Sequence, residues 1–188
     1  LASAQAAHTQ WNRSRATITT NNPQFNRLID QTFLDLFILR QPLPKGTALA
    51  AGLPWFACAF GRDQAITAMQ ILPYLPQVSK AVILNLAHYQ GVKVDEYREE
   101  KPGKIMHELR LGEMARAGET PFSPYFGTVD ATPLWLLLLS RYVEQTGDLK
   151  LARRLWKNVE AAIGYVQHEI AEKGYLTYEA GDKTALVN

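Results

Sequence analysis

Residues 52–63 read Gly-Leu-Pro-Trp-Phe-Ala-Cys-Ala-Phe-Gly-Arg-Asp, an apolar run that ends in the adjacent charges Arg62 and Asp63. A helical pattern follows at once, with apolar residues on one helix face at Ala65, Ile66, Ala68, Met69 and Leu72. Asp63 therefore either caps this helix or faces a ligand. Arg62 either faces the same ligand or is a solvated surface charge. Sugars suit a ligand site here, because hydroxyls need donors and acceptors and C–H faces need flat surfaces such as Trp55.

The same order of residues recurs at positions 124–133, which read Pro-Tyr-Phe-Gly-Thr-Val-Asp-Ala-Thr-Pro. Tyr125 stands just upstream of Asp130, and Asp130 precedes the most apolar helical stretch, Leu134–Leu139. A helix N-cap is again the simple interpretation of the carboxylate. If the two loops lead into successive inner helices of one fold, Asp63 and Asp130 would instead lie on the same rim. The two independent motifs would then converge on one site.

Helical periodicity dominates the chain and predicts an all-α protein of about five helices. Asn22-Pro23 is typical of a helix start, and Ser79 and Asp148 are the expected caps of the third and fifth helices. The fourth helix is apolar on all sides around Leu134–Leu139, so we expect it to be buried on all sides. Buried and half-exposed helices in alternation favour a layered array, or a toroid of inner helices covered by outer ones.

The remaining segments are predicted to be irregular. Residues 1–22 are polar and rich in alanine, which indicates a loose arm or a helix tail. Residues 41–61 are expected to form a loop, and residues 175–179 a short strand or an extended loop. Residues 92–128 are charged and rich in glycine and proline, and a connection of this length indicates either a functional loop or a wrong assignment of its structure.

Within the long loop, the charged residues 95–101 are expected to form a solvated face with some local pairing. His107 and Glu108 differ, because Ile105 and Met106 precede them and predict an apolar anchor. The other histidines lie in unrelated segments, and the sequence lacks the His-Glu-x-x-His pattern of zinc hydrolases. We therefore expect no metal and no cofactor.

Composition excludes several other classes of protein. The 188 residues suit one domain, and a net charge of +2 without a basic block argues against nucleic-acid binding. The longest apolar run, Leu134–Leu139, is too short to span a bilayer. Cys58 is the only cysteine and lies in an apolar run, which indicates a packed thiol, a reducing compartment and a cytoplasmic protein.

Carboxylates next to aromatic residues, without a metal motif or a nucleophile elbow, favour glycosidic chemistry. Cleavage of an acetal needs one carboxylic acid to protonate the leaving oxygen and a second carboxylate to assist water or to attack the ring. In inverting enzymes these two groups stand roughly 6.5–9.5 Å apart, which leaves room for the water.

At these residues the sequence resembles the amylo-α-1,6-glucosidase family, the glucosidase part of glycogen debranching enzymes, and most of all its bacterial branch. The similar segments are Gly52–Asp63, Arg98–Glu108, Tyr125–Leu134 and Thr146-Gly147-Asp148, in the order and spacing of the family. Gln64 departs from the family pattern, where a small hydroxyl residue is expected.

The resemblance implies an (α/α)₆ toroid and inverting hydrolysis of α-1,6-glucosidic branch linkages in glycogen-like α-glucans. Residues 1–188 would be the N-terminal part of the catalytic domain, cut at both ends, with the general acid and the general base beyond Asn188. The implied substrate-binding residues are Trp55, Arg62, Asp63, His107, Glu108, Tyr125 and Asp130. We accordingly expect the piece to be inactive alone, and to self-associate through the exposed surface of inner helices around Leu134–Leu139 and Trp135.

Three alternatives remain open at this point. Another α/α-toroid enzyme, similar to glucoamylase or trehalase, would differ in substrate preference. A non-enzymatic helical scaffold that binds a protein would lack carbohydrate affinity and would tolerate neutralisation of Asp63 or Asp130. A plain helical domain with capped helices and a solvated loop is the least informative alternative.

Overall fold

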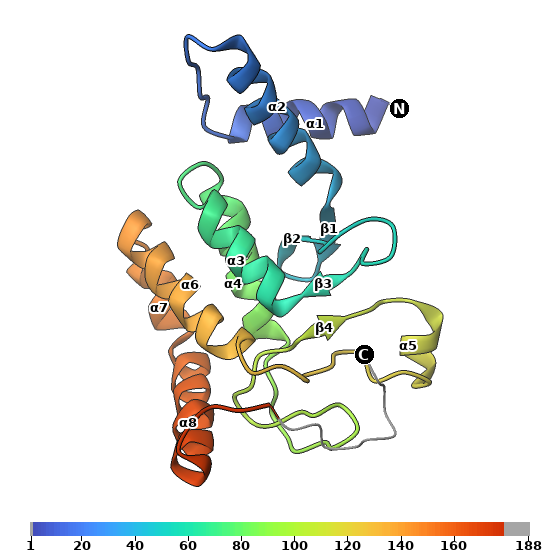
Figure 1. Ribbon diagram of the computed structural model, residues 1–188, viewed down its shortest axis with the longest axis vertical. Helices are drawn as coiled ribbons and strands as arrows, with labels where there is room; N and C mark the ends of the chain where they lie inside the picture. Colours follow the sequence, from blue (N-terminus) through green and yellow to red (C-terminus); the bar gives the residue numbers. More distant parts are fainter. Residues whose placement is uncertain (1, 179–188) are drawn as a thin grey trace.

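The computed structural model describes residues 2–178, which are mostly helical as the periodicity predicts. Eight helices lie in this part of the chain (Figure 1): α1 Ala2–Ser14, α2 Pro23–Ile38, α3 Gly61–Ile71, α4 Pro76–His88, α5 Glu113–Ala117, α6 Ala131–Thr146, α7 Leu149–Arg154 and α8 Trp156–Lys173. The prediction of about five helices is wrong for three reasons. The N-terminal arm contains α1, the long loop contains the short α5, and the expected fifth helix divides at Leu155 into α7 and α8.

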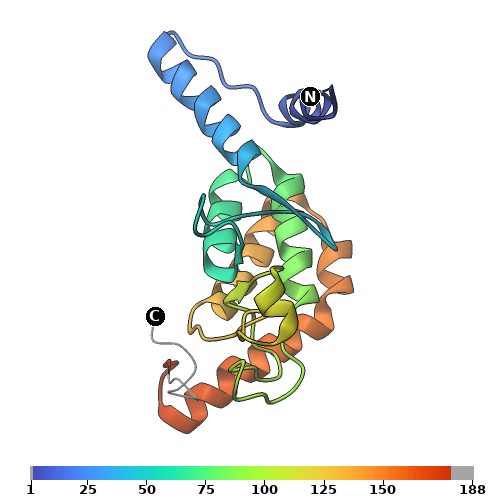
Figure 2. The same ribbon diagram turned by 90° about the vertical axis from the view of Figure 1, so that its right-hand side faces the viewer.

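The core lies where α3, α4 and α6 pack against one another (Figure 2). Trp135 of α6 is fully buried there, and its indole Nε1 donates a hydrogen bond of 3.1 Å to the carbonyl oxygen of Ile83 in α4. The C-terminal ends of α3 and α6 also lie together, because Leu72 and Arg141 line one hollow. Since their N-terminal ends meet as well, at Arg62 and Asp130, α3 and α6 run parallel as neighbours.

Burial of α6 differs from the expectation. Trp135, Leu138 and Leu139 are buried by this chain itself, whereas Leu137 is 45% exposed. The prediction that α6 is buried on all sides is therefore wrong, and so is the expectation that the Trp135 side chain is left uncovered. An ordinary amphipathic stripe explains the pattern, because one face packs on α3 and α4 and the opposite face meets water.

Local capping chemistry explains several helix ends. Asn22 caps α2, because its Oδ1 accepts hydrogen bonds from the backbone nitrogens of Gln24 and Phe25. Asp148 caps α7 in the same way through the nitrogen of Leu151. Ser79 does not cap α4, which already begins at Pro76, and its hydroxyl instead donates to the buried carbonyl oxygen of Ala68 at 2.8 Å.

Residues 41–61 are not simply a loop, which corrects the prediction. Strands β1 (Arg40–Leu43) and β2 (Gly46–Leu49) form an antiparallel hairpin in which Arg40 pairs with Leu49. The hairpin packs on α4, where the Asn85 side chain accepts a hydrogen bond of 3.0 Å from the Lys45 nitrogen and donates to the Gly46 carbonyl oxygen. Strand β3 (Ala59–Phe60) follows and leads directly into α3.

A second, smaller apolar cluster joins the N-terminal helices to the rest of the molecule. Its buried members are Trp11, Phe33, Leu49, Ile71, Leu75 and Val78. Beyond this junction, α1 and α2 extend away from the other helices at one end of the molecule (Figures 1 and 2). The cluster therefore connects α1 and α2 to the hairpin and to the turn between α3 and α4.

The C-terminal part of the described chain ends in an extended segment. Gly174 closes α8 in the left-handed conformation, and residues 175–178 follow without strand pairing. Glu179 of the expected strand and the Leu186–Asn188 segment lie outside the described residues. No helix between residues 2 and 178 combines the length and the apolar character needed to cross a bilayer.

Candidate sugar-binding site

Two helix N-termini meet at one rim of the molecule. Arg62, in the first turn of α3, directs its Nη1 to Oδ2 of Asp130, which immediately precedes α6, at 3.1 Å. The arginine side chain is 49% exposed and the aspartate side chain 32%, so the pair faces solvent. The two aromatic loops identified in the sequence therefore end side by side, although 68 residues separate the paired charges.

Neither carboxylate makes a capping hydrogen bond to its helix, so that part of the capping interpretation is wrong, although Asp63 does lie in the first turn of α3. Asp130 occupies the N-cap position of α6 but makes no capping hydrogen bond, and its Oδ1 instead accepts from the Thr128 hydroxyl at 2.7 Å. Burial tends to raise the pKa of Asp130, yet the hydrogen bonds from Thr128 and Arg62 outweigh it and hold the pKa below the ordinary value.

Asp63 lies beside this pair with an uncommitted side chain. It sits in the first turn of α3 and is exposed, and no hydrogen bond or ion pair joins its carboxylate to any residue in the described part of the chain. A cavity of about 240 Å³ opens next to it. Its polar lining comes from Asp63, Gln64 and Thr67, and its apolar lining includes Leu36, Leu39 and Leu49.

A short strand pair places His107 and Glu108 beneath the start of α3. Strand β4 (Glu108–Leu109) pairs antiparallel with β3, with Phe60 opposite Glu108. The Gly61 nitrogen donates to the His107 carbonyl oxygen at 2.8 Å. Glycine is required at position 61, because a Cβ there would lie only 2.0 Å from the carbonyl oxygen of Met106.

The imidazole of His107 contacts two aromatic rings. The rings of Phe60 and Tyr125 meet it nearly edge to face, at centroid distances of 5.3 and 6.1 Å. Its Nδ1 is buried and has no hydrogen-bond partner among the described residues. Burial lowers the pKa of His107 and outweighs the opposing charge of Glu108, which favours the neutral ring.

Glu108 is buried and already paired, which separates it from the open part of the rim. It is 4% exposed, and one carboxylate oxygen accepts hydrogen bonds from Arg110 Nε and, at 3.5 Å, from Cys58 Sγ. Burial raises the pKa of the Cys58 thiol to about 11, which keeps it protonated and inert at neutral pH. Glu108 thus fixes the strand ends and does not face a ligand in this conformation.

Tyr125 belongs to a second polar group that the sequence did not indicate. Its hydroxyl donates to Glu99 Oε1 at 3.0 Å and lies 3.3 Å from the Tyr178 hydroxyl. Burial, and next the hydrogen bond with Tyr178, raise the pKa of Tyr125. Glu99 itself has a positive φ of 52°, which a side chain other than glycine adopts only when its surroundings impose it. Tyr125 therefore offers its ring, and not its hydroxyl, to the His107 side.

Trp55 stands apart from the other expected site residues. It is 80% exposed at the tip of the loop between β2 and β3, where Leu53 and Phe56 are also more than half exposed. Phe56 connects this loop to the site, because its ring lies 6.1 Å from that of Phe60. Trp55 makes no ring contact within residues 2–178, so its side chain is a free aromatic surface on this loop.

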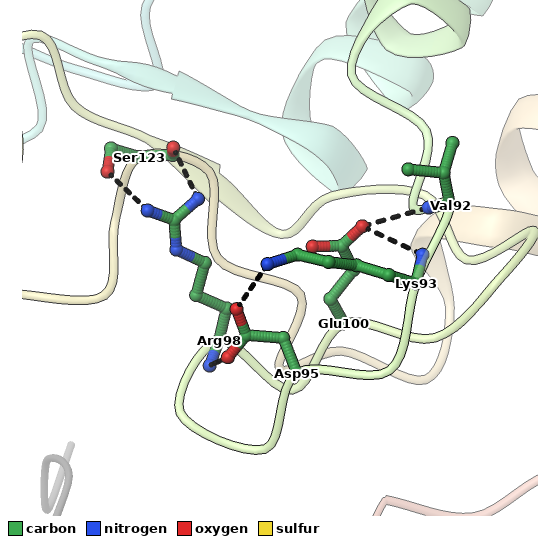
Figure 3. A network of polar contacts seen from close by, with 6 residues as sticks. All are labelled: Val92, Lys93, Asp95, Arg98, Glu100 and Ser123. Atoms are coloured by element: carbon green, nitrogen blue, oxygen red, sulfur yellow. Dashed lines mark hydrogen bonds and ion pairs between the residues drawn. The ribbon is translucent and has the colours of Figure 1, made fainter.

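The charged part of the long loop is ordered by internal hydrogen bonds (Figure 3). Glu100 is 7% exposed and accepts from the nitrogens of Val92 and Lys93 at 2.8 and 3.3 Å. Arg98 donates to the carbonyl oxygen of Ser123 at 3.1 Å, which ties this loop to the segment before Tyr125. The expectation of a solvated face is therefore wrong for Glu100, whose burial reflects its role in closing the turn.

The structure thus joins Arg62 to Asp130 at the surface, with Asp63 next to Arg62 in the first turn of α3, and the charges of all three act on the nearby His107. Glu108 and Tyr125 lie nearby but bond elsewhere. Three residues that contact this group were not predicted as site residues, namely Thr128, Arg110 and Glu99. The only signal for them in the sequence is a hydroxyl or a charge close to a motif. No group of three or more potential metal-ligating side chains occurs among the described residues.

No protein-family model matches this chain, and a search of curated proteins finds no match either. The assignment of a function therefore depends on the geometry of this rim and on the sequence motifs that form it.

Proposed function

We propose that this chain carries part of the sugar-binding pocket of a glycoside hydrolase that acts on α-1,6-glucosidic branch linkages of glycogen-like α-glucans. The observation that supports the proposal best is the meeting of Arg62 and Asp130 beside the uncommitted carboxylate of Asp63. Together they offer fixed donors and acceptors at one exposed place. A sugar ring needs this combination, because each hydroxyl both donates and accepts hydrogen bonds.

The surroundings of the rim supply the apolar part of the same recognition. Trp55 offers an exposed ring, and amphipathic rings of this kind are well suited to binding surfaces. The cavity beside Asp63 combines one carboxylate and two neutral polar side chains with leucines, which suits a ring that has hydroxyls at its edge and C–H groups on its faces. The proposal gives all these residues binding roles, and proton transfer is not assigned to any of them.

The arrangement of the helices agrees with the same proposal. Within it, the parallel neighbours α3 and α6 are inner helices of an incomplete (α/α)₆ toroid, α4 is the outer helix between them in the chain, and α8 is the outer helix that follows α6. The proposed enzyme is cytoplasmic, works by inversion and needs no cofactor. Self-association of the 188-residue chain stays a prediction.

Titration of the chain with glucose, isomaltose and maltose, followed by calorimetry and by backbone amide NMR shifts, tests this function. We expect isomaltose to bind more tightly than maltose and to shift the amides of residues 61–63 and 128–131. Arg62→Ala is expected to weaken binding by about tenfold or more, which is the contribution of one hydrogen bond to a charged group.

Arg141→Ala is the matched control, because Arg141 forms a comparable exposed ion pair with Glu144, at 3.2 Å, near the opposite end of α6. It is expected to bind sugars as the wild type does. A preference for maltose or trehalose would favour a glucoamylase-like or trehalase-like enzyme. No affinity for any sugar, together with unchanged behaviour of Asp63→Asn and Asp130→Asn, would overturn the proposal.

A further inference from the structure

Arg40, at the start of β1, holds its guanidinium group in an aromatic setting away from the rim. Its Cζ lies 3.9 Å from the ring centroid of Phe37 and 5.2 Å from that of Trp11. Its Nε donates to the carbonyl oxygen of Phe37 at 3.1 Å. These contacts fix the plane of the group, and a guanidinium keeps its charge even where burial lowers its pKa, as it does for Arg40.

The charge of Arg40 is not balanced by a carboxylate. No ion pair in residues 2–178 includes Arg40. Desolvation is the cause of its lowered pKa, and no neighbouring carboxylate opposes it. A half-buried cation without a counter-charge favours an anion from outside the chain.

Arg40 also lines a cavity of about 420 Å³ between α1, the hairpin and α4. The polar side chains around it are neutral ones that carry donors, namely Gln10, Ser14, Thr47 and Gln77, and no acidic residue lines it. The Gln77 amide donates to the carbonyl oxygen of Ser14 at 3.0 Å, so α1 and α4 are joined at its wall. The cavity therefore has a net positive lining and a size within the range of small-ligand sites.

We propose that this cavity binds a small oxyanion, a phosphate or carboxylate group, with Arg40 as its charged partner. The planar guanidinium donates two parallel hydrogen bonds to such a group, and stacking on Phe37 and Trp11 orients it in advance. Gln10, Thr47 and Gln77 supply further donors. None of these residues belongs to the candidate sugar site, so this inference does not depend on the proposed function.

The test is a titration of the whole chain with inorganic phosphate, with acetate and, as an ionic-strength control, with sodium chloride. The readouts are the NMR signal of the Arg40 Nε–H group and the melting temperature. We expect phosphate, acetate or both to shift that signal saturably and to raise the melting temperature, with chloride ineffective at equal ionic strength. A response to phosphate alone identifies a phosphate site, and a response to acetate alone a carboxylate site.

Two variants and one control complete the test. Arg40→Gln removes the cation, and Gln10→Glu places a carboxylate in the cavity without touching the stacked arginine, so each is expected to weaken anion binding by about tenfold or more. Arg27→Gln removes the same charge from an exposed position on α2 and is expected to bind as the wild type does. The inference is overturned if neither anion shifts the signal, or if Gln10→Glu binds as tightly as the wild type.

Discussion

The Nη1 atom of Arg62 and the Oδ2 atom of Asp130 lie 3.1 Å apart and join the first turn of α3 to the residue before α6. Both side chains are partly exposed, and exposed ion pairs contribute little to stability. The pair therefore positions two charged groups at the rim and is not a major source of folding energy.

We expect a double-mutant cycle of Arg62→Ala and Asp130→Ala to give a coupling free energy of about 0.2–1 kcal/mol, the usual range for exposed pairs. Urea unfolding of the wild type, both single variants and the double variant measures it. Sugar affinity of the same four proteins is expected to change more than their stability. A coupling energy of several kcal/mol would show that the pair is buried in solution.

Gly61→Ala is expected to destabilise the fold by about 1–3 kcal/mol or more, because the new Cβ would lie 2.0 Å from the Met106 carbonyl oxygen. Gly164→Ala in the interior of α8 is the matched control, since no atom lies within 4 Å of its Cβ position. It is expected to stabilise by about 0.5–1 kcal/mol through helix propensity. Thermal and urea unfolding measure both, and equal effects of the two changes would contradict the close approach of β4 to α3.

Gln64→Leu is expected to raise stability by about 1–3 kcal/mol, because both polar atoms of the Gln64 amide are buried without a partner among the described residues. Asn85→Leu is the contrasting change. Asn85 is equally buried, but its amide bonds to Lys45, Gly46 and Ala81, so its loss is expected to destabilise. Urea midpoints of both variants decide, and destabilisation by Gln64→Leu would mean that the amide has a partner in solution.

Glu169 of α8 anchors the long loop, because Lys101 donates to its Oε1 at 2.5 Å and Lys173 lies 3.4 Å from its Oε2. Burial tends to raise the pKa of Glu169, but the hydrogen bond and charge of Lys101 outweigh it and lower the pKa. A lowered carboxyl pKa stabilises the fold above the unfolded-state value of about 4.3, and this contribution is lost as the pH falls through the folded-state value.

Glu169→Gln is accordingly expected to cost about 1.5–3 kcal/mol at neutral pH. The difference from the wild type should begin to shrink as the pH falls below about 4.3, where the unfolded-state carboxylate takes up a proton, and should vanish once the pH has fallen through the lowered folded-state value. Glu172→Gln, at an exposed position one turn away, is the control and should have little effect. Urea unfolding across this pH range measures both variants, and a constant difference at all pH values would contradict the assignment.

The sequence by itself determined the elements whose causes are local. Helical periodicity placed most helices, and the caps at Asn22 and Asp148 and the stop at Gly174 follow from hydrogen bonds and backbone preferences within a few residues. The β1–β2 hairpin escaped prediction because Pro42 and Pro44 suggest an irregular segment. Its stability comes from packing on α4, where Asn85 binds the turn.

Only the tertiary structure decided how the candidate site is assembled. The sequence indicated Asp63 and Asp130 equally as caps or as ligand residues, and the contact with Arg62 and Thr128 decided against capping for Asp130. The sequence likewise paired His107 with Glu108, but the two side chains have separate surroundings. His107 lies among aromatic rings, where burial favours its neutral form, whereas Glu108 accepts a hydrogen bond from Arg110. Periodicity reports contacts within one helix turn, whereas these partnerships depend on which distant segments pack together and on which side chains lose their water.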